Sequence, residues 1–177
     1  MKVLGISGSL RQGSYNSRLL RVAADLLPPG AELEVFDRLG KIPPFNADAE
    51  QSPPPSVVAL KEAISAADAV LIATPEYNHS IPGGLKNALD WVSRPIATNP
   101  MRGKPALVIG ASTGMFGAVW AQAETRKVLG ALGARVVDEE LPVALAPEGL
   151  DEYEVITGLA DLLSDLVSSG EALTRAA

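Results

Sequence analysis

Apolar residues occur in three uninterrupted runs of strand length, at residues 2–7, 69–74 and 105–112. Runs that are continuous rather than alternating are typical of strands buried on both faces of a parallel sheet. Residues 32–37 alternate instead, with Leu33, Val35 and Phe36 as the candidate inward side chains, so they predict an edge strand. Residues 134–139 predict a fifth strand.

Between these runs, apolar residues recur with the period of a helix. The first such segment, residues 17–27, places five aliphatic side chains on one face: Leu19, Leu20, Ala23, Leu26 and Leu27. The other predicted helices cover residues 56–67, 83–92, 118–132 and 152–173. Because each strand is followed by a helix, and such crossovers are right-handed, we expect an α/β domain with a doubly wound parallel sheet.

Ligands of a doubly wound sheet bind beyond the carboxyl ends of its strands, where the strand order reverses. Three distinctive loops are predicted to meet there: "GSLRQGSYNS" (8–17), "TPEYNHSIPGG" (74–84) and "ASTGMFGA" (111–118). The proline-rich segment 38–56 is too long for a simple connection, so we expect it to cover this site or a subunit interface. No repeat or linker divides the chain, which predicts one domain over residues 1–177.

The amino-acid composition limits the kinds of functional site and partner that the chain can have. The 177 residues are 47% hydrophobic and include no cysteine, which excludes disulfides, thiolate nucleophiles and sulfur-ligated metals. A net charge of -6 without a basic cluster argues against nucleic acid as a partner. The apolar start is shorter than a signal-peptide core, and no apolar run approaches the roughly 18 residues of a membrane span. We therefore expect a cytoplasmic protein without membrane contact.

The first loop nearly fits several known motifs. The spacing from Gly8 to Gly13 is that of a P-loop, but Ser14 and Tyr15 stand where lysine and Ser/Thr are required. The glycines do not form a dinucleotide fingerprint, and "GISGS" lacks the last glycine of a nucleophile elbow. What remains is a strand-to-helix turn rich in polar side chains: Ser9, Arg11, Ser14, Asn16 and Ser17.

Backbone amides, a helix amino terminus and one guanidinium together suit a terminal phosphate monoester. The alternative is that Ser14 or Asn16 is only a helix N-cap and that Arg11 is a solvated surface residue. Taken as a cluster at the predicted reversal of strand order, these residues favour phosphate.

In the second loop, Pro75 stiffens the chain and Tyr77 offers an aromatic surface. Ser80 is predicted to cap the helix that begins near Pro82. The Glu76 side chain either contributes to the site or faces water. His79, the only histidine, is a candidate proton donor, although a lone histidine in a polar loop is more often simply solvated.

With these three segments the sequence resembles the NADPH-dependent FMN reductases, a family of flavodoxin-like fold that includes quinone, azo-dye and chromate reductases. The resemblance implies a five-stranded parallel sheet of order 2-1-3-4-5 and bound FMN. It assigns Ser9, Arg11, Ser14 and Asn16 to the phosphate, and Pro75, Glu76, Tyr77 and Asn78 to the isoalloxazine ring. Ser112, Thr113, Gly114 and Gly117 would border the pyrimidine end of the ring or the ribityl chain.

In this region many relatives have a second glycine and then an arginine, where this chain has Ala118 and Trp120. The choice between NADPH and NADH is therefore left open.

The expected function is an FMN-dependent oxidoreductase that passes a hydride from NADPH or NADH through FMN to a quinone-like or other small electrophilic acceptor. The alternatives are a flavodoxin-like electron carrier and an FMN reductase that supplies free reduced flavin to a monooxygenase. The family resemblance also implies a homodimer or homotetramer, for which Phe45, Trp91 and Trp120 offer apolar contacts.

Overall fold

The structure is a computed structural model that describes residues 1–176, with side chains through Ala172. A parallel sheet in the order β2-β1-β3-β4-β5 forms its centre, with a further strand, β6, paired to β4. The strands are β1 (Lys2–Ser7), β2 (Glu32–Phe36), β3 (Ala69–Thr74), β4 (Pro105–Ala111), β5 (Arg135–Val136) and β6 (Pro142–Val143). The predicted parallel arrangement and strand order are confirmed.

The fifth place in the sheet differs from the prediction, because two short strands share it. β5 pairs with the beginning of β4 and β6 with its end. Between β5 and β6, the buried side chain of Gln122 binds the backbone of Leu141. It accepts from the Leu141 amide at 3.2 Å and donates to the Leu141 carbonyl at 3.2 Å. Residues 137–141 belong to no strand, and the Gln122 side chain holds Leu141 just before β6.

The helices follow the predicted segments closely. They are α1 (Tyr15–Leu26), α2 (Pro55–Ala66), α3 (Gly83–Val92), α4 (Val119–Ala131), α5 (Ala146–Gly149) and α6 (Tyr153–Ala176), with short 3-10 helices η1 (Leu39–Lys41), η2 (Ala47–Ala49) and η3 (Ile96–Thr98). The single turn of α5 was not predicted, because four residues are too few to show a helical period.

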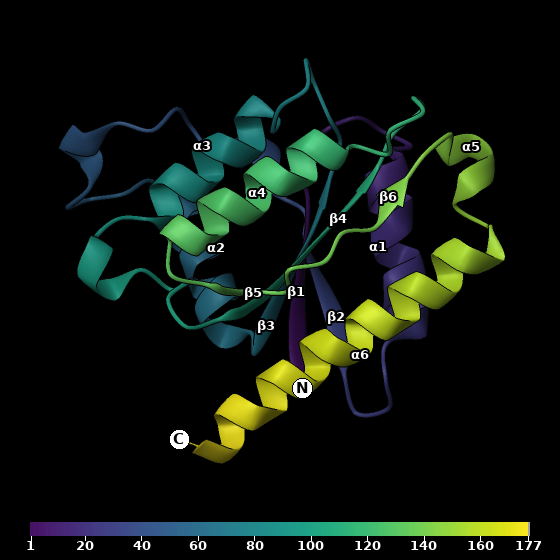
Figure 1. Cartoon of the computed structure of the whole chain (residues 1–177). Coiled ribbons are helices and arrows are strands. Elements are labelled where there is room, and N and C mark those ends of the chain that lie inside the picture. Colours follow the sequence, from purple (N-terminus) through teal and green to yellow (C-terminus); the bar gives the residue numbers. More distant parts are fainter. Residues whose placement is uncertain (177) are drawn as a thin grey trace.

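Helices cover both faces of the sheet, as Figure 1 shows. α1 and α6 pack on one face, around Leu19, Leu71 and Leu163. α2, α3 and α4 pack on the other, around Ile64 and Ile72. β3 and β4 are buried along their whole length, which is why their sequences are continuously apolar.

One inward side chain of the edge strand was predicted wrongly. Val35 is 46% exposed, whereas Phe36 is buried and Leu33 is half-buried. α1 packs mainly over β1, β3 and β4, so it covers the edge strand β2 less completely on that face of the sheet.

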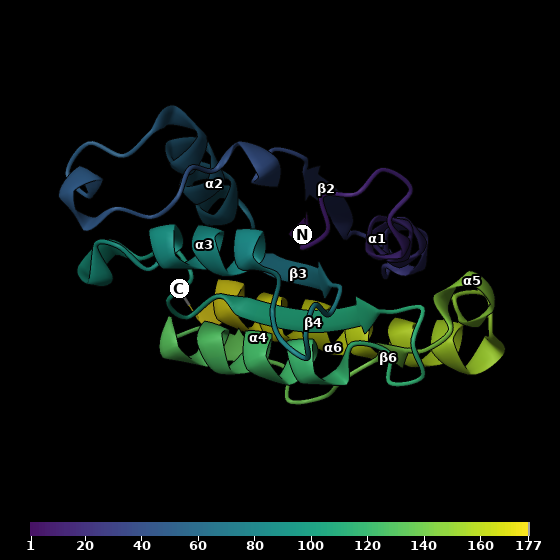
Figure 2. The same ribbon diagram turned by 90° about the horizontal axis from the view of Figure 1, so that it is seen from above.

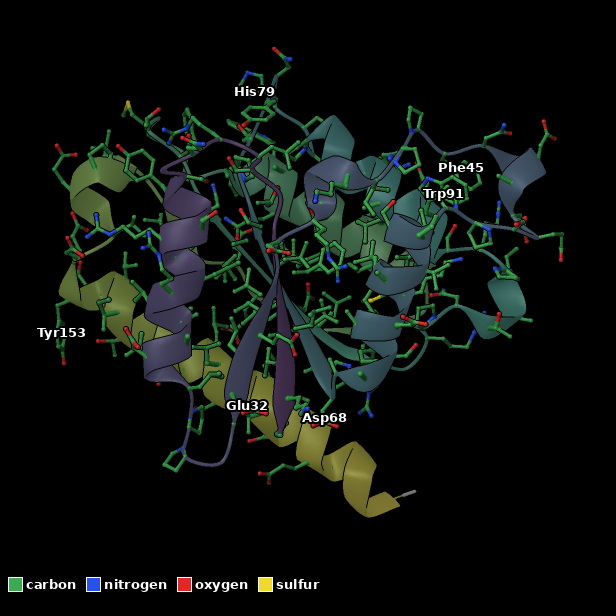
Figure 3. All side chains as sticks on the ribbon, turned by 180° about the vertical axis from the view of Figure 1, so that it is seen from behind. Glu32, Phe45, Asp68, His79, Trp91 and Tyr153 are labelled. Carbon is green, nitrogen blue, oxygen red and sulfur yellow. The ribbon has the colours of Figure 1, made fainter. Side chains whose placement is uncertain are left out.

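The long segment 38–56 packs against α3. Trp91 donates from Nε1 to the carbonyl of Pro43 at 2.8 Å, and the rings of Phe45 and Trp91 meet edge to face at 5.0 Å, side by side in Figure 3. In Figure 2 the arrowheads of β3 and β4 point away from this segment. None of its residues lines the cavity at the carboxyl edge of the sheet, although Gly40 lies close to Leu10 of the first loop. That the segment covers a subunit interface stays a prediction. Trp91 is buried in its own chain, so the prediction that it offers a contact between subunits is wrong.

Candidate functional site

The three polar loops meet at the carboxyl ends of β1, β3 and β4, as the reversal of strand order predicts. They enclose a cavity of about 340 Å³. Its lining is Ser9, Arg11, Ser14, Tyr15, Asn16, Pro75, Glu76, Tyr77, Ala111, Ser112 and Thr113. Figure 3 shows His79 above this edge, with Glu32 and Asp68 at the opposite end of the molecule.

Nine of the residues expected at the site therefore line one cavity: Ser9, Arg11, Ser14, Asn16, Pro75, Glu76, Tyr77, Ser112 and Thr113. Ser17, Asn78, Gly114 and Gly117 lie outside the lining. Tyr15 and Ala111 also line the cavity and were not predicted as site residues. Both follow from position alone, because Ala111 ends β4 and Tyr15 begins α1.

Ser14 starts α1. Its hydroxyl accepts the amide of Asn16 at 3.2 Å, so the N-cap interpretation of Ser14 is confirmed. Within the part of the chain that the structure describes, nothing accepts the amide protons of residues 12–15. These donors and the positive end of α1 are available to an anion.

Arg11 is exposed, stands 5.4 Å from the centre of the Tyr15 ring, and has no carboxylate partner among residues 1–176. The only hydrogen-bond acceptor of its guanidinium there is the carbonyl of Gln12, at a long 3.5 Å, while its backbone amide donates to the Ser9 hydroxyl at 3.4 Å. The first loop thus carries one uncompensated guanidinium beside free amides, a donor set that suits a phosphate group.

Asn16 is 2% exposed and connects the first loop to β4. Its side chain donates to the carbonyl of Ala111 at 2.9 Å and accepts the amide of the same residue at 3.0 Å. Both ends of the carboxamide are therefore engaged with backbone. Ser17 is engaged as well, since its hydroxyl donates to that of Ser7 at 3.1 Å.

The second loop contains a two-residue turn at its centre. The backbones of Tyr77 and Ser80 exchange hydrogen bonds of 3.2 and 3.1 Å, and the two residues between them have positive φ, 53° at Asn78 and 58° at His79. Such turns favour asparagine or glycine, because they can adopt the left-handed conformation. The turn leaves Tyr77 half-exposed at the mouth of the cavity.

Glu76 does not face water. Its side chain is only 12% exposed, and Oε2 accepts the amides of Trp120 at 3.0 Å and Ala121 at 3.1 Å. These are first-turn donors of α4, which have no partner inside the helix. The residue before α4 is Ala118, at a φ of 63°, and it has no side chain that can cap. Glu76 therefore caps α4 from the neighbouring loop.

Ser80 does not cap α3. Its hydroxyl donates to Oε2 of Glu124 on α4 at 2.5 Å, and the same oxygen accepts the amide of Ile81 at 3.1 Å. The Ser80 hydroxyl, followed by the Ile81 amide, holds the pKa of Glu124 below its ordinary value. Pro82 occupies the N-cap position of α3 without a side-chain hydrogen bond, so the predicted Ser80 cap is wrong.

His79 is the exposed tip of this loop. Its Nδ1 lies 3.6 Å from Oε1 of Glu76, and its ring meets that of Trp120 edge to face at 4.8 Å. The imidazole therefore has a carboxylate neighbour and an aromatic neighbour rather than water on every side.

Gly117 in the third loop serves the packing of the sheet. Its φ is 55°, and a Cβ there would lie 2.4 Å from the carbonyl carbon of Pro142. The close neighbour is thus the backbone of β6. Gly114 donates from its amide to the Ser112 hydroxyl at 3.1 Å, so it supports the shape of the loop.

In the acidic segment 138–140, Glu140 pairs with Arg126 at 2.9 Å. No group of potential ligands large enough for a metal ion occurs among the described residues. Within that same part of the chain, none of the helices combines the length and the apolar character needed to cross a membrane.

The chain is similar to several known flavoenzymes. It is 54% identical to an NAD(P)H-dependent FMN reductase of Pseudomonas aeruginosa over 130 residues, which are 73% of this chain and 69% of that one. It is 40% identical to a quinone reductase of Escherichia coli over 141 residues, 78% of this chain and 74% of that one.

Among solved structures, FerB of Paracoccus denitrificans, described as a flavoenzyme NAD(P)H:(acceptor) oxidoreductase, superimposes with a TM-score of 0.84 at 35% identity. The match covers 97% of each chain. Residues 1–148 match the family described as NADPH-dependent FMN reductase. The chain therefore belongs to the NADPH-dependent FMN reductase family, as its three loops suggested.

Proposed function

We propose that the cavity binds FMN, and that the chain uses NADPH or NADH to reduce a quinone-like acceptor. The observation that carries this proposal is the juxtaposition, in one cavity, of an anion-binding turn and a loop presenting Pro75 and Tyr77. The E. coli relative is named a quinone reductase, which supports the acceptor class. The volume of about 340 Å³ lies within the range of small-molecule sites.

The donor set of the first loop fits the FMN phosphate without a metal. We assign the phosphate to Arg11, the hydroxyl of Ser9 and the free amides of residues 12–15. Each charge-assisted hydrogen bond contributes roughly 1.5 to 3 kcal/mol, so a few of them hold a dianion. Ser14 and Asn16 shape this turn, because their side chains already bind backbone groups.

The ring side of the cavity is formed by the second and third loops. We assign the isoalloxazine ring to Pro75, Glu76 and Tyr77, and the region beside it to Ser112 and Thr113. Ser17, Asn78, Gly114 and Gly117 flank these residues and are proposed to support them.

When bound, FMN accepts a hydride from the nicotinamide and passes two electrons to an acceptor. The chain has to hold the ring, leave one face open and present a surface on which a flat molecule can lie. Met115, Phe116 and Trp120 are exposed beside the cavity and provide such an apolar surface together with Tyr77. Hydride transfer depends on alignment, so the proposal needs no acid or base from the protein.

We further propose that residues 1–177 act as one cytoplasmic domain in a homodimer or homotetramer. Residue 177 lies outside the described residues. The exposed apolar side chains at the site favour assembly, because surfaces of this kind are uncommon on monomers. Light scattering after size exclusion measures the assembly, and a purely monomeric protein would contradict it.

An anaerobic visible spectrum of the FMN-loaded protein tests the function. We expect one equivalent of NADPH or NADH to bleach the flavin and an added quinone to restore its colour. Bound flavin that neither nucleotide bleaches would instead indicate an electron carrier. Flavin that is reduced but lost on dialysis would indicate a supplier of free reduced FMN.

Substitution of Arg11 tests the phosphate assignment separately. Arg11→Ala is expected to weaken FMN binding by about tenfold or more, the loss of one charge-assisted contact. The matched control is Arg21→Ala, which removes the same charge from an exposed position farther along α1. Equal FMN affinity in Arg11→Ala and wild type would refute the assignment.

A further inference from the structure

Two glutamates connect the second loop to α4 in opposite directions. Glu76 lies on the loop and accepts the amides of Trp120 and Ala121, at the start of α4. Glu124 lies on α4, one helical turn later, and accepts from the hydroxyl of Ser80 and from the amide that follows it. Each carboxylate therefore receives two donors from the element opposite. We call this pair the reciprocal carboxylate bridges.

These bridges are the hydrogen bonds that anchor the loop. Among residues 1–176, the backbone and side chains of residues 76–81 form no other hydrogen bond to a different element. The turn is closed only by the exchange between Tyr77 and Ser80, and both of its central residues adopt positive φ. Asparagine adopts this conformation readily, but at His79 it is costly and persists only where the surroundings fix it.

The bridged loop carries the ring side of the cavity. Pro75, Glu76 and Tyr77 line the cavity, and Tyr77 lies directly between Glu76 and the rest of the turn. On the other side of the turn, the His79 ring meets the Trp120 ring edge to face, and its Nδ1 lies 3.6 Å from Oε1 of Glu76. A shift of the loop relative to α4 would therefore move the wall that faces the flavin.

We propose that Glu76 and Glu124 are positioning residues for flavin reduction: together they fix the 75–80 loop against α4 and so set the alignment of the bound ring with the nicotinamide. This inference rests on the proposed function. Hydride transfer is sensitive to alignment, and a displacement of about 1 Å can cost up to about a hundredfold in rate. Glu124 lies outside the cavity lining and acts only through the loop, whereas Glu76 also lines the cavity.

Ionised carboxylates suit this role better than neutral side chains. One oxygen of each glutamate accepts two donors, and Glu76 also opposes the positive end of α4. The lowered pKa of Glu124 agrees with an ionised group that receives these hydrogen bonds. Glutamine retains one accepting oxygen without the charge, so it should preserve part of the effect.

The test compares Glu76→Ala, Glu124→Ala and the double variant with wild type, all loaded with FMN. Stopped-flow absorbance gives the rate constant of flavin reduction at saturating NADPH, and fluorescence titration gives the dissociation constant for FMN. Thermal unfolding of the FMN-free proteins reports any general loss of stability. The matched control is Glu140→Ala, which removes a carboxylate contact to the same helix away from the loop.

Each alanine variant is expected to reduce flavin on the order of tenfold more slowly, even when every protein molecule holds FMN. The double variant should be slowed by less than the product of the two single effects, because both substitutions release the same loop. Glu76→Gln and Glu124→Gln should fall between alanine and wild type. Glu140→Ala should reduce flavin at the wild-type rate.

Reduction at the wild-type rate in both alanine variants would overturn the inference, and so would a loss explained entirely by lower FMN occupancy. If an alanine variant does not fold, the corresponding glutamine variant is measured in its place. Flavin reduction at the wild-type rate in that glutamine variant would overturn the inference. A wild-type protein that binds FMN but is not reduced by NADPH or NADH would refute the proposed function itself.

Discussion

Asn16 joins two of the three loops that form the cavity, and its replacement tests how the site is built. In Asn16→Ala, the carboxamide that pairs with both backbone groups of Ala111 is lost. Asn16 is 2% exposed and Ala111 is 3% exposed, so the backbone N–H and C=O are left without partners in a buried place. The carboxyl end of β4 should then be less firmly held.

The structure sets the size of this effect. A buried polar group that loses its partner costs about 1 to 3 kcal/mol, so two such groups cost about 2 to 6 kcal/mol. We expect a loss of about 3 kcal/mol in the free energy of unfolding, since water can enter the space left by the side chain. For a chain of this size, that corresponds to a fall of about 6 to 12 °C in the melting temperature.

Urea unfolding without FMN measures the stability, and fluorescence titration measures FMN binding. The chain offers a matched control in Asn99, a buried carboxamide that donates to Leu132 and accepts from Met101, outside the cavity lining. Asn99→Ala should lose comparable stability and keep its FMN affinity, whereas Asn16→Ala should lose both. A loss below about 0.5 kcal/mol in Asn16→Ala, the usual range of neutral surface changes, would refute the reasoning.

Three further predictions concern stability. Gly117→Ala should destabilise far more than Gly13→Ala in urea unfolding: both have positive φ, but only at Gly117 would a Cβ collide with backbone. Similar losses of stability in the two variants would contradict this prediction. Because the pKa of Glu124 is lowered in the folded state, its stabilisation is present above pH 4.5 and is lost as the pH falls through the folded-state pKa. The stability difference between wild type and Glu124→Gln should therefore shrink below pH 4.5. A difference that does not change with pH would contradict the stabilising hydrogen bonds from Ser80 and Ile81 to an ionised Glu124. Phe45→Ala should cost about 1 to 2 kcal/mol through its contact with Trp91, with unchanged flavin reduction; slower reduction would place segment 38–56 at the site.

The fold was predictable because its signals are local. The continuous apolar runs of β1, β3 and β4 follow from burial on both faces, and the helical periods between them define the crossovers. The rule that ligands bind beyond the carboxyl ends of the strands then indicated which loops would meet. β5 lies within the predicted fifth strand, whereas β6 escaped prediction, because two residues are too few to show a period.

The roles of single polar side chains were less predictable. A glutamate in a polar loop has the same local sequence whether it faces water or, as Glu76 does, caps a helix that begins more than forty residues later. The Ser80 hydroxyl could either accept an amide of α3 as an N-cap or donate to a distant acceptor, and the position of Glu124 decides that it donates. Gly117 is explained by β6 rather than by a ligand.

By itself, the sequence determined the α/β architecture, the edge of the sheet that carries the site, and the types of residue gathered there. These follow from periodicity, from burial and from the chemistry of short segments, all of which act over neighbouring residues. Only the tertiary structure decided which donors remain free for an anion and which polar side chains bind backbone. Hydrogen bonds are short and directional, so their partners are set by contacts between segments that lie far apart along the chain.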